Sequence, residues 1–252
     1  MPTTNEHLSS LVLSVVDGPA RSGRLTLDEI ESRQIISSLG IPTCIPSLVR
    51  SREDAVAIAG EFQSPVSLKI VSADIPHKSA HGCVALSVTG PDEVRIAYEK
   101  IWDHALAVTS ADRIRGVAIE PMAVPGLETF LGLTRDPLFG AVVVFGIGGV
   151  FVETLGDTAM RLPPLSDADI DSMITELRGR SLILGDERSH QHRDVSAIKT
   201  AIQRLIELVP MECIESVDIN PLLVYPEGEG TRAVDGSIVL NQAFVDEATL
   251  RP

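Results

Sequence analysis

Residues 67–83 read SLKIVSADIPHKSAHGC and join an apolar run to a cluster of basic side chains. The run carries Lys69 in its middle and is typical of a strand, and the loop after it contains His77, Lys78 and His81. A strand lysine on a cleft face can offer a fixed ammonium group to a phosphate. An imidazole can accept a phosphoryl group or hold an anion near neutral pH. The stretch therefore indicates a strand that ends in an anion site.

Other interpretations of the same residues stay open at this level. Lys69 can belong to an edge strand, with its stem reaching towards water. The loop can be an ordinary surface loop with incidental histidines. Metal binding by His77 and His81 is a weaker option, because no cluster of carboxylates or cysteines completes a site at the usual spacing.

Composition limits the classes of protein. The 252 residues are 44% hydrophobic and 22% charged, which is an ordinary globular balance. The formal net charge of −14 argues against a nucleic-acid surface, which needs clustered Lys and Arg, but it allows a local basic pocket for a small phosphorylated ligand. The 3 cysteines are scattered without CxxC spacing, which favours reduced thiols over a disulfide framework.

The chain lacks the sequence pattern of a membrane protein. Its longest apolar run, residues 141–152, is interrupted by glycines and is too short to span a bilayer. The N-terminus has a short apolar patch without a preceding positive charge, so it is a poor signal peptide. We expect a soluble, cytoplasmic protein with no membrane partner.

The order of elements predicts an α+β fold with two subdomains. Residues 1–24 are expected to be a weakly ordered lead-in, 25–115 the first subdomain and 116–245 the second. Thr26 and Ser51 are expected to begin helices, since each starts a capping box. Further elements of the first subdomain are expected as strands at 66–71 and 84–88 and as a helix from Pro91 onwards.

The second subdomain is expected to end in a β-hairpin. Strands are predicted near 117–120, 128–133 and 141–145, and Ser166 and Asp194 each have the pattern of a helix N-cap. Residues 178–193 are polar and are predicted to form a long mobile loop. Strands at 216–219 and 222–225 precede a Pro-Glu-Gly-Glu-Gly turn and strands at 232–235 and 237–240.

Two further sets of residues are candidates for phosphate and metal chemistry. The glycines of FGIGG, residues 145–149, would let backbone N–H groups approach a phosphate, or they simply form a tight turn. Asn220 and Asp235 lie across the predicted hairpin, where their oxygens can converge on a Mg²⁺ ion beside a nucleotide. The alternative is turn chemistry, because Asn before Pro and Asp before Gly both favour turns.

Four segments together resemble one family. They are LKIVSADIPHKS, GLETFLGLTRDPLFG, VVFGIGGVFVE and VDINPLLVYPEG followed by VDG, and they appear in family order over roughly residues 24–241. In this set the chain resembles the ATP-grasp (beta) subunit of ADP-forming acyl-CoA synthetases, the acetate–CoA ligase (ADP-forming) family related to succinyl-CoA synthetase.

The resemblance implies an ATP-grasp fold, in which two α+β subdomains enclose Mg-nucleotide. It also implies the reaction acyl-CoA + ADP + phosphate ⇌ acid + CoA + ATP, in which a phosphohistidine carries the phosphoryl group. A CoA-binding alpha-type subunit is the implied partner in a hetero-oligomer. The sequence identifies neither the acid nor a preference for ATP over GTP.

The resemblance also assigns roles to individual residues. His77 would be the relay histidine, and Mg²⁺ would be held by Asn220 and Asp235. The residues implied in nucleotide binding are Lys69, the hinge residues Glu120 to Ala123 with Glu120 and Met122, Glu128 and Arg135 near ribose and phosphates, and Gly148 and Gly149 beneath the phosphates.

The hinge has EPM where the family often has QEM, and three further positions depart from the family pattern. Ala80 and Cys83 replace an acid and a glycine after the HKS segment, and Ser237 stands where a basic residue is common. These departures motivate an alternative, a catalytically weakened ATP-grasp-like module that regulates a partner. A third interpretation is an ATP-grasp ligase of another class, such as a carboxylate–amine ligase, which would need no CoA-binding partner.

Overall fold

The computed structural model describes residues 4–75, 78–148, 156–185 and 192–251. The chain divides into two compact units. The large unit comprises residues 1–43 and 125–252, and the small unit comprises residues 44–124. These boundaries differ from the expected division at 115/116, because residues 116–121 form a strand that pairs inside the small unit. Residues 25–43 likewise belong to the large unit rather than to the small one.

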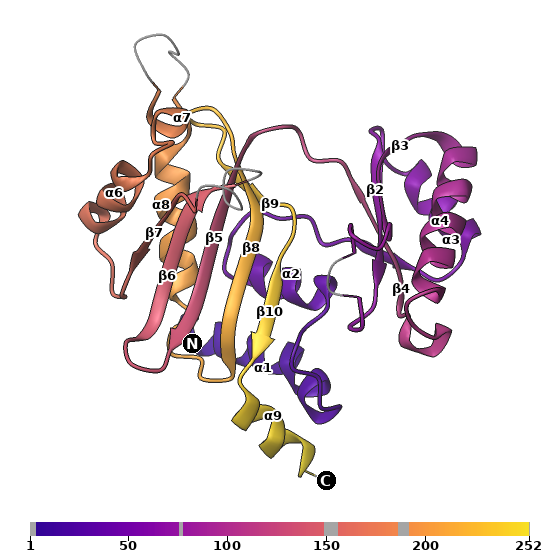
Figure 1. Ribbon diagram of the computed structural model, residues 1–252, viewed down its shortest axis with the longest axis horizontal. Coiled ribbons are helices and arrows are strands. Elements are labelled where there is room, and N and C mark those ends of the chain that lie inside the picture. The colour runs from indigo at the N-terminus through magenta and orange to yellow at the C-terminus, as the bar shows by residue number, and fades with distance from the viewer. Residues whose placement is uncertain (1–3, 76–77, 149–155, 186–191, 252) are drawn as a thin grey trace. The chain divides into compact units, whose positions relative to one another are not determined.

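The small unit is a four-stranded antiparallel sheet with two helices packed on one face (Figure 1). The strand order is β1-β4-β2-β3, so β2 and β4 are central. In chain order the elements are β1 (Ser47–Val49), α3 (Arg52–Gly60), β2 (Val66–Val71), β3 (Val84–Val88), α4 (Gly90–Leu106), the 3-10 helix η1 (Ala111–Arg113) and β4 (Gly116–Pro121).

Strand β2 is buried along its whole length. Leu68 and Ile70 belong to the hydrophobic core shared with α3 and α4. Successive side chains of a strand point to opposite faces, so Ser67 and Lys69 point away from these helices. The predicted strands at 66–71 and 84–88 are confirmed, as is the helix that Pro91 opens.

The large unit is a six-stranded antiparallel sheet with the path β10-β8-β5-β6-β7, and β9 pairs with β8. Its helices contribute to one hydrophobic core with the sheet. Its elements are α1 (Thr4–Arg21), α2 (Glu29–Ser38), β5 (Leu127–Asp136), β6 (Gly140–Ile147), β7 (Thr158–Arg161), α6 (Asp167–Glu176), α7 (Ser181–Leu184), α8 (Val195–Ile206), β8 (Ile214–Val224), β9 (Thr231–Ala233), β10 (Ser237–Leu240) and α9 (Gln242–Thr249).

The two faces of the large sheet differ in burial. On β5, Leu131 and Leu133 are buried in the core with the helices, whereas Glu128 and Thr134 on the opposite face are exposed. On β8, Asp218 and the neighbouring exposed positions share this opposite face, because Asp218 pairs with Gly132. We call this side the open face of the large sheet. It carries exposed polar side chains such as Glu128 and Asp218.

Three local expectations need correction. Residues 4–21 form helix α1, which packs on α2 and α9, so this segment is not a weakly ordered lead-in. The capping box of α2 is formed by Asp28 and Glu31 rather than by Thr26, since the Asp28 carboxylate accepts from the Glu31 N–H. Residues 181–184 form the short helix α7 within the predicted loop, of which 186–191 lie outside the described residues.

The other predicted caps are confirmed. Ser51, Ser166 and Asp194 begin α3, α6 and α8, and each side chain accepts from the N–H three residues on. The predicted hairpin forms from β8 and β9. Helices packed on antiparallel sheets confirm the α+β class. Among the described residues, no helix has the length and apolar character needed to cross a membrane.

Candidate functional site

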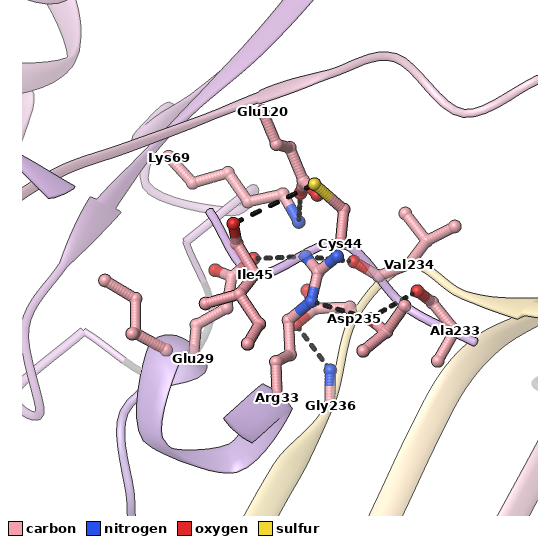
Figure 2. Close-up of polar contacts among 12 residues, drawn as sticks. Glu29, Arg33, Cys44, Ile45, Lys69, Glu120, Ala233, Val234, Asp235 and Gly236 are labelled. Atoms are coloured by element: carbon pink, nitrogen blue, oxygen red, sulfur yellow. Dashed lines mark hydrogen bonds and ion pairs between the residues drawn. The ribbon is translucent and has the colours of Figure 1, made fainter. Parts of the chain in front are cut away.

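Lys69 and Glu120 form a buried ion pair in the small unit. They lie on the same face of the sheet, because Lys69 pairs with Ala118 and Ser67 pairs with Glu120 across β2 and β4. The Lys69 Nζ is 3.4 Å from the Glu120 Oε1, and both side chains are less than a tenth exposed (Figure 2). Since β2 is central, the edge-strand interpretation of Lys69 is wrong. A buried ammonium that faces away from the helices is a suitable group to bind an anion.

The hinge segment that follows Glu120 is fixed by backbone pairing. Pro121 pairs with Val66, and the Met122 N–H donates to the Pro65 carbonyl over 2.8 Å. The Met122 side chain is half-buried. The N–H of Met122 is therefore already hydrogen-bonded within the small unit. A nucleotide base beside the hinge would contact other groups of the hinge residues.

Asn220 and Asp235 occupy matching positions between the two ladders that β8 forms with β9 and β10. Leu222 pairs with Ala233 in the β8–β9 ladder, and Asp218 pairs with Ser237 in the β8–β10 ladder. Continuing either register by two residues pairs Asn220 with Asp235. Their side chains are accessible or half-exposed, so this polar pair is open to a ligand.

A bulge in β8 adds to this arrangement. The register between β5 and β8 shifts between Thr129 and Leu131, so that Asn220 and Pro221 together oppose the single residue Phe130. Bulges often occur beside functional sites because they change the direction of a side chain. Here the bulge lies at Asn220 itself.

Asp218 is a candidate site residue that the sequence alone did not indicate. Its carboxyl is accessible to water, yet enough protein surrounds it that partial desolvation raises its pKa, and the nearby Asp235 carboxylate raises it further. A carboxyl whose ionisation is disfavoured by a neighbouring carboxylate is a suitable ligand for a cation. Asp218 lies two residues before Asn220, and such residues of a strand point to the same face. This spacing could have identified Asp218 as a candidate from the sequence.

The donor set fits a hard divalent cation. Among the described residues, no group of three or more His, Cys, Asp or Glu side chains forms a metal site by itself. Asp218, Asn220 and Asp235 offer two carboxylates and one amide oxygen, and Mg²⁺ characteristically takes one or two carboxylates and completes its shell with phosphate oxygens and water. These three residues could therefore hold Mg²⁺ together with a nucleotide.

Arg135 donates hydrogen bonds to the backbone of its own unit, and its predicted contact with ribose and phosphates stays a prediction. Its Nε donates to the Ile214 carbonyl at 2.7 Å, and its Nη2 donates to the carbonyls of Val209 and Met211 at 2.8 and 3.0 Å. These carbonyls lie between the end of α8 and the start of β8. The guanidinium thus satisfies three part-buried backbone acceptors, which gives Arg135 a structural role in the large unit.

Glu128 and Gly148 lie side by side where β5 and β6 meet. The Gly148 N–H donates to the Glu128 carbonyl at 2.8 Å, and a Cβ on Gly148 would lie 2.9 Å from the carbonyl carbon of Glu128. A glycine is required by this close backbone approach alone. The side chain of Glu128 is exposed on the open face. Gly149 lies outside the described residues.

The loop after β2 is anchored on both sides of residues 76–77, which lie outside the described residues. Before the gap, the Asp74 carboxylate accepts from Arg113 Nε and Nη2 at 3.0 and 2.9 Å and from the Thr109 hydroxyl, and this pairing lowers the pKa of Asp74 to about 2. After the gap, His104 Nδ1 lies 2.9 Å from the Gly82 carbonyl oxygen. His77 itself lies outside the described residues.

Two of the positions that depart from the family pattern, Cys83 and Ser237, have different surroundings in the structure. Cys83 is fully buried in the core of the small unit, and burial raises the pKa of its thiol. Ser237 is exposed and pairs with Asp218. The side chain of Cys83 therefore belongs to the packing of the unit, whereas Ser237 lies beside the candidate metal ligands.

A family model for the ATP-grasp domain matches residues 19–240, which is most of the chain. The chain belongs to the ATP-grasp family. This ATP-grasp chain is 34% identical over 230 residues to the beta subunit of acetate–CoA ligase (ADP-forming) II of Pyrococcus furiosus, and the match covers 90% of this chain and 97% of that subunit.

Solved structures of acetyl-coenzyme A synthetase 1 from Ca. Korarchaeum cryptofilum are also similar to this ATP-grasp chain. In its complex with coenzyme A and Ca-AMPCP, the TM-score is 0.85 at 38% identity, covering 91% of this chain and 99% of that chain. In its complex with coenzyme A and Mg-AMPPCP, the phosphohistidine segment points towards the nucleotide binding site. That chain has a TM-score of 0.77 at 36% identity, covering 91% of this chain and 100% of its own length. The predicted ATP-grasp fold is confirmed.

Proposed function

We propose that this chain is the nucleotide-binding subunit of an ADP-forming acyl-CoA ligase and transfers a phosphoryl group between ATP or ADP and a histidine. The observation that carries this proposal is the match to nearly the full length of the P. furiosus beta subunit. The regulatory-module alternative is less well supported, because Cys83, one of its motives, is a core residue.

Lys69 is the proposed phosphate ligand of the small unit. In the structure its ammonium is balanced by Glu120 at 3.4 Å, so the buried charge is neutralised before nucleotide binds. A nucleotide phosphate would replace Glu120 as the partner of the ammonium or share it. The neighbouring hinge residues, including Met122, are proposed to contact the base.

Mg²⁺ is the cofactor, and we propose Asn220 and Asp235 as its ligands with Asp218 beside them. Bound Mg²⁺ neutralises charge on the nucleotide phosphates during phosphoryl transfer, which depends mainly on positioning and charge stabilisation. The chain's own residues would hold that ion: the β8–β9 and β8–β10 ladders lie on either side of Asn220 and Asp235 and share one register, which supports this pairing. Glu128 and Gly148 are proposed to lie beside the phosphates and ribose, together with Gly149.

His77 is the proposed relay. Its imidazole would take the phosphoryl group from the nucleotide or return it, while the acyl and CoA chemistry takes place on a partner. The implied partner is a CoA-binding alpha-type subunit, since the matched relative is itself named as a beta subunit. The cytoplasm is the proposed location, consistent with three free cysteines.

The proposal is tested by phosphohistidine formation. The full chain is incubated with Mg²⁺ and γ-labelled ATP, with and without a CoA-binding subunit and acyl-CoA, and acid-labile, base-stable label is measured. His77→Ala should lose the label while its nucleotide affinity stays within about twofold of wild type. His81→Ala, at an exposed position of the same loop, is the matched control and should keep the label. Wild-type labelling of His77→Ala would show that the relay is assigned to the wrong residue.

A further inference from the structure

Arg33 is a fully buried arginine in α2 of the large unit. Its side chain is 1% exposed, and that of its ion-pair partner Glu29 is 0% exposed. Arginine is almost never fully buried unless it is paired, because desolvating a guanidinium is costly. A buried ion pair often contributes little net stability compared with apolar residues of the same volume. The ion pair between Arg33 and Glu29 therefore has another role, which is to hold neighbouring groups in place.

The Arg33 guanidinium binds the backbone just before Asp235. Its Nη1 donates to the Val234 carbonyl at 2.7 Å and lies 3.5 Å from Glu29 Oε1 (Figure 2). Its Nε donates to the Thr43 hydroxyl at 3.1 Å. A planar guanidinium can serve such divergent acceptors at once, which the point charge of lysine does less well.

Thr43 extends this contact to the preceding residue. Its hydroxyl, which accepts from Arg33, donates to the Ala233 carbonyl at 2.9 Å. The Ala233 N–H donates in turn to the Pro42 carbonyl at 2.8 Å. Two successive carbonyls, those of Ala233 and Val234, are thus held by Thr43 and Arg33 (Figure 2).

The same short segment is held from its other sides. The Val234 N–H donates to the Pro221 carbonyl at 3.1 Å, next to Asn220. A Cβ on Gly236 would lie 2.3 Å from Ile36 Cδ1, so α2 packs directly on the backbone after Asp235. The residues on both sides of Asp235 therefore have little freedom to move relative to α2.

We propose that Arg33, with Glu29 and Thr43, is a positioning residue for the divalent metal site. It fixes the carbonyls of Ala233 and Val234, and so keeps the Asp235 carboxylate opposite Asn220. This inference rests on the proposed function, because it assumes that Asp235 binds Mg²⁺ beside a nucleotide.

The test measures the Mg²⁺ concentration that gives half-maximal ADP binding by the full chain. Arg33→Met should raise this concentration by about tenfold or more, as is typical when a residue that orients a metal ligand is lost. Arg33→Lys should give a smaller shift. Saturating Mg²⁺ should restore ADP binding to both variants, which a merely misfolded protein would not show.

Ile202→Ala is the stability control. Ile202 is buried in α8, in the core of the same unit, so the variant loses core packing and melts earlier. Its Mg²⁺ midpoint should stay at the wild-type value. If Ile202→Ala and Arg33→Met shifted the midpoint equally, the effect would be one of general stability and the proposal would be overturned.

Each remaining outcome is informative. A wild-type Mg²⁺ midpoint in Arg33→Met would overturn the positioning role while leaving the proposed function intact. If wild type itself bound ADP without any dependence on Mg²⁺, the proposed function would fail instead. If Arg33→Met does not fold, Arg33→Lys and Thr43→Val carry the same test, and wild-type midpoints in both would overturn the proposal.

Discussion

Ser237 lies directly opposite Asp218 in the antiparallel pair of β10 and β8. Asp218 therefore faces a neutral hydroxyl on one side and the Asp235 carboxylate nearby, and its pKa is raised. A basic residue at position 237 would offer a compensating charge. We propose a bound cation as a counterpart of the two carboxylates, and substitution of Asp218 tests this proposed metal site.

Asp218→Asn should stabilise the metal-free protein near neutral pH. The folded-state pKa of Asp218 is raised above its unfolded value, so ionisation destabilises the fold as pH rises through that interval. The difference in melting temperature between the variant and wild type without Mg²⁺ should therefore grow in favour of the variant as pH rises from about 4 towards the raised pKa. Thermal melts over this range, without metal, measure it.

The same variant should bind Mg-ADP less tightly, because a negative charge beside the ion is lost. Ser237→Ala, which leaves both carboxylates in place, is the matched control and should retain the wild-type pH dependence. If Asp218→Asn lowered the metal-free melting temperature at neutral pH, the electrostatic interpretation of this pair would be incorrect.

Lys69→Met should lose both stability and nucleotide affinity. The substitution leaves the Glu120 carboxylate buried without its 3.4 Å partner, at a typical cost of about 3–5 kcal/mol in the free energy of unfolding. The double variant Lys69→Met/Glu120→Met should recover most of the stability but not the ADP affinity. Chemical denaturation and calorimetry with Mg-ADP separate the two effects. ADP binding by the double variant at wild-type affinity would remove Lys69 from the phosphate site.

Arg135→Met should destabilise the fold without removing nucleotide binding. Three backbone carbonyls lose a charged donor, and we expect a loss of about 2–3 kcal/mol in the free energy of unfolding. The dissociation constant for Mg-ADP, measured below the melting transition, should change by less than about threefold. A large loss of ADP affinity in a folded variant would instead favour the phosphate contact implied by the resemblance.

Gly82→Ala should disturb the loop that contains the proposed relay histidine. Gly82 has a φ of +66°, and a Cβ there would lie 2.5 Å from His104 Nδ1, so we expect a cost of about 1–3 kcal/mol in the free energy of unfolding. Phosphohistidine formation should fall more than ADP affinity does. The double variant Gly82→Ala/His104→Ala removes the steric clash and should be less destabilised than the sum of the single variants. An additive result would show that His104 does not restrain Gly82.

Local sequence chemistry predicted many elements correctly. Ser51, Ser166 and Asp194 mark helix starts because an N-cap depends only on residues within one turn. Strand β2 was recognisable from its apolar run. The capping box at Asp28 was misplaced by two residues because Thr26 also begins an acceptable pattern. Helix α1 was missed, since its stability comes from packing on α2 and α9.

Part of the candidate site could not be predicted from the sequence. Arg135 lies in a family motif, but its partners are carbonyls more than 70 residues away along the chain. The burial of Arg33 follows from its contact with Val234, which is 201 residues away in sequence. Such contacts depend on which strands pair and in what register, and the local pattern of residues does not contain that information.

The sequence by itself determined the class of fold, the family through the order of its motifs, and the candidates Lys69, Asn220 and Asp235. Only the tertiary structure decided that Glu120 neutralises Lys69 and that Asp218 shares its surroundings with Asp235. The physical reason is that propensities and caps act over a few residues, whereas charges separated by many residues interact only after strand register brings them together.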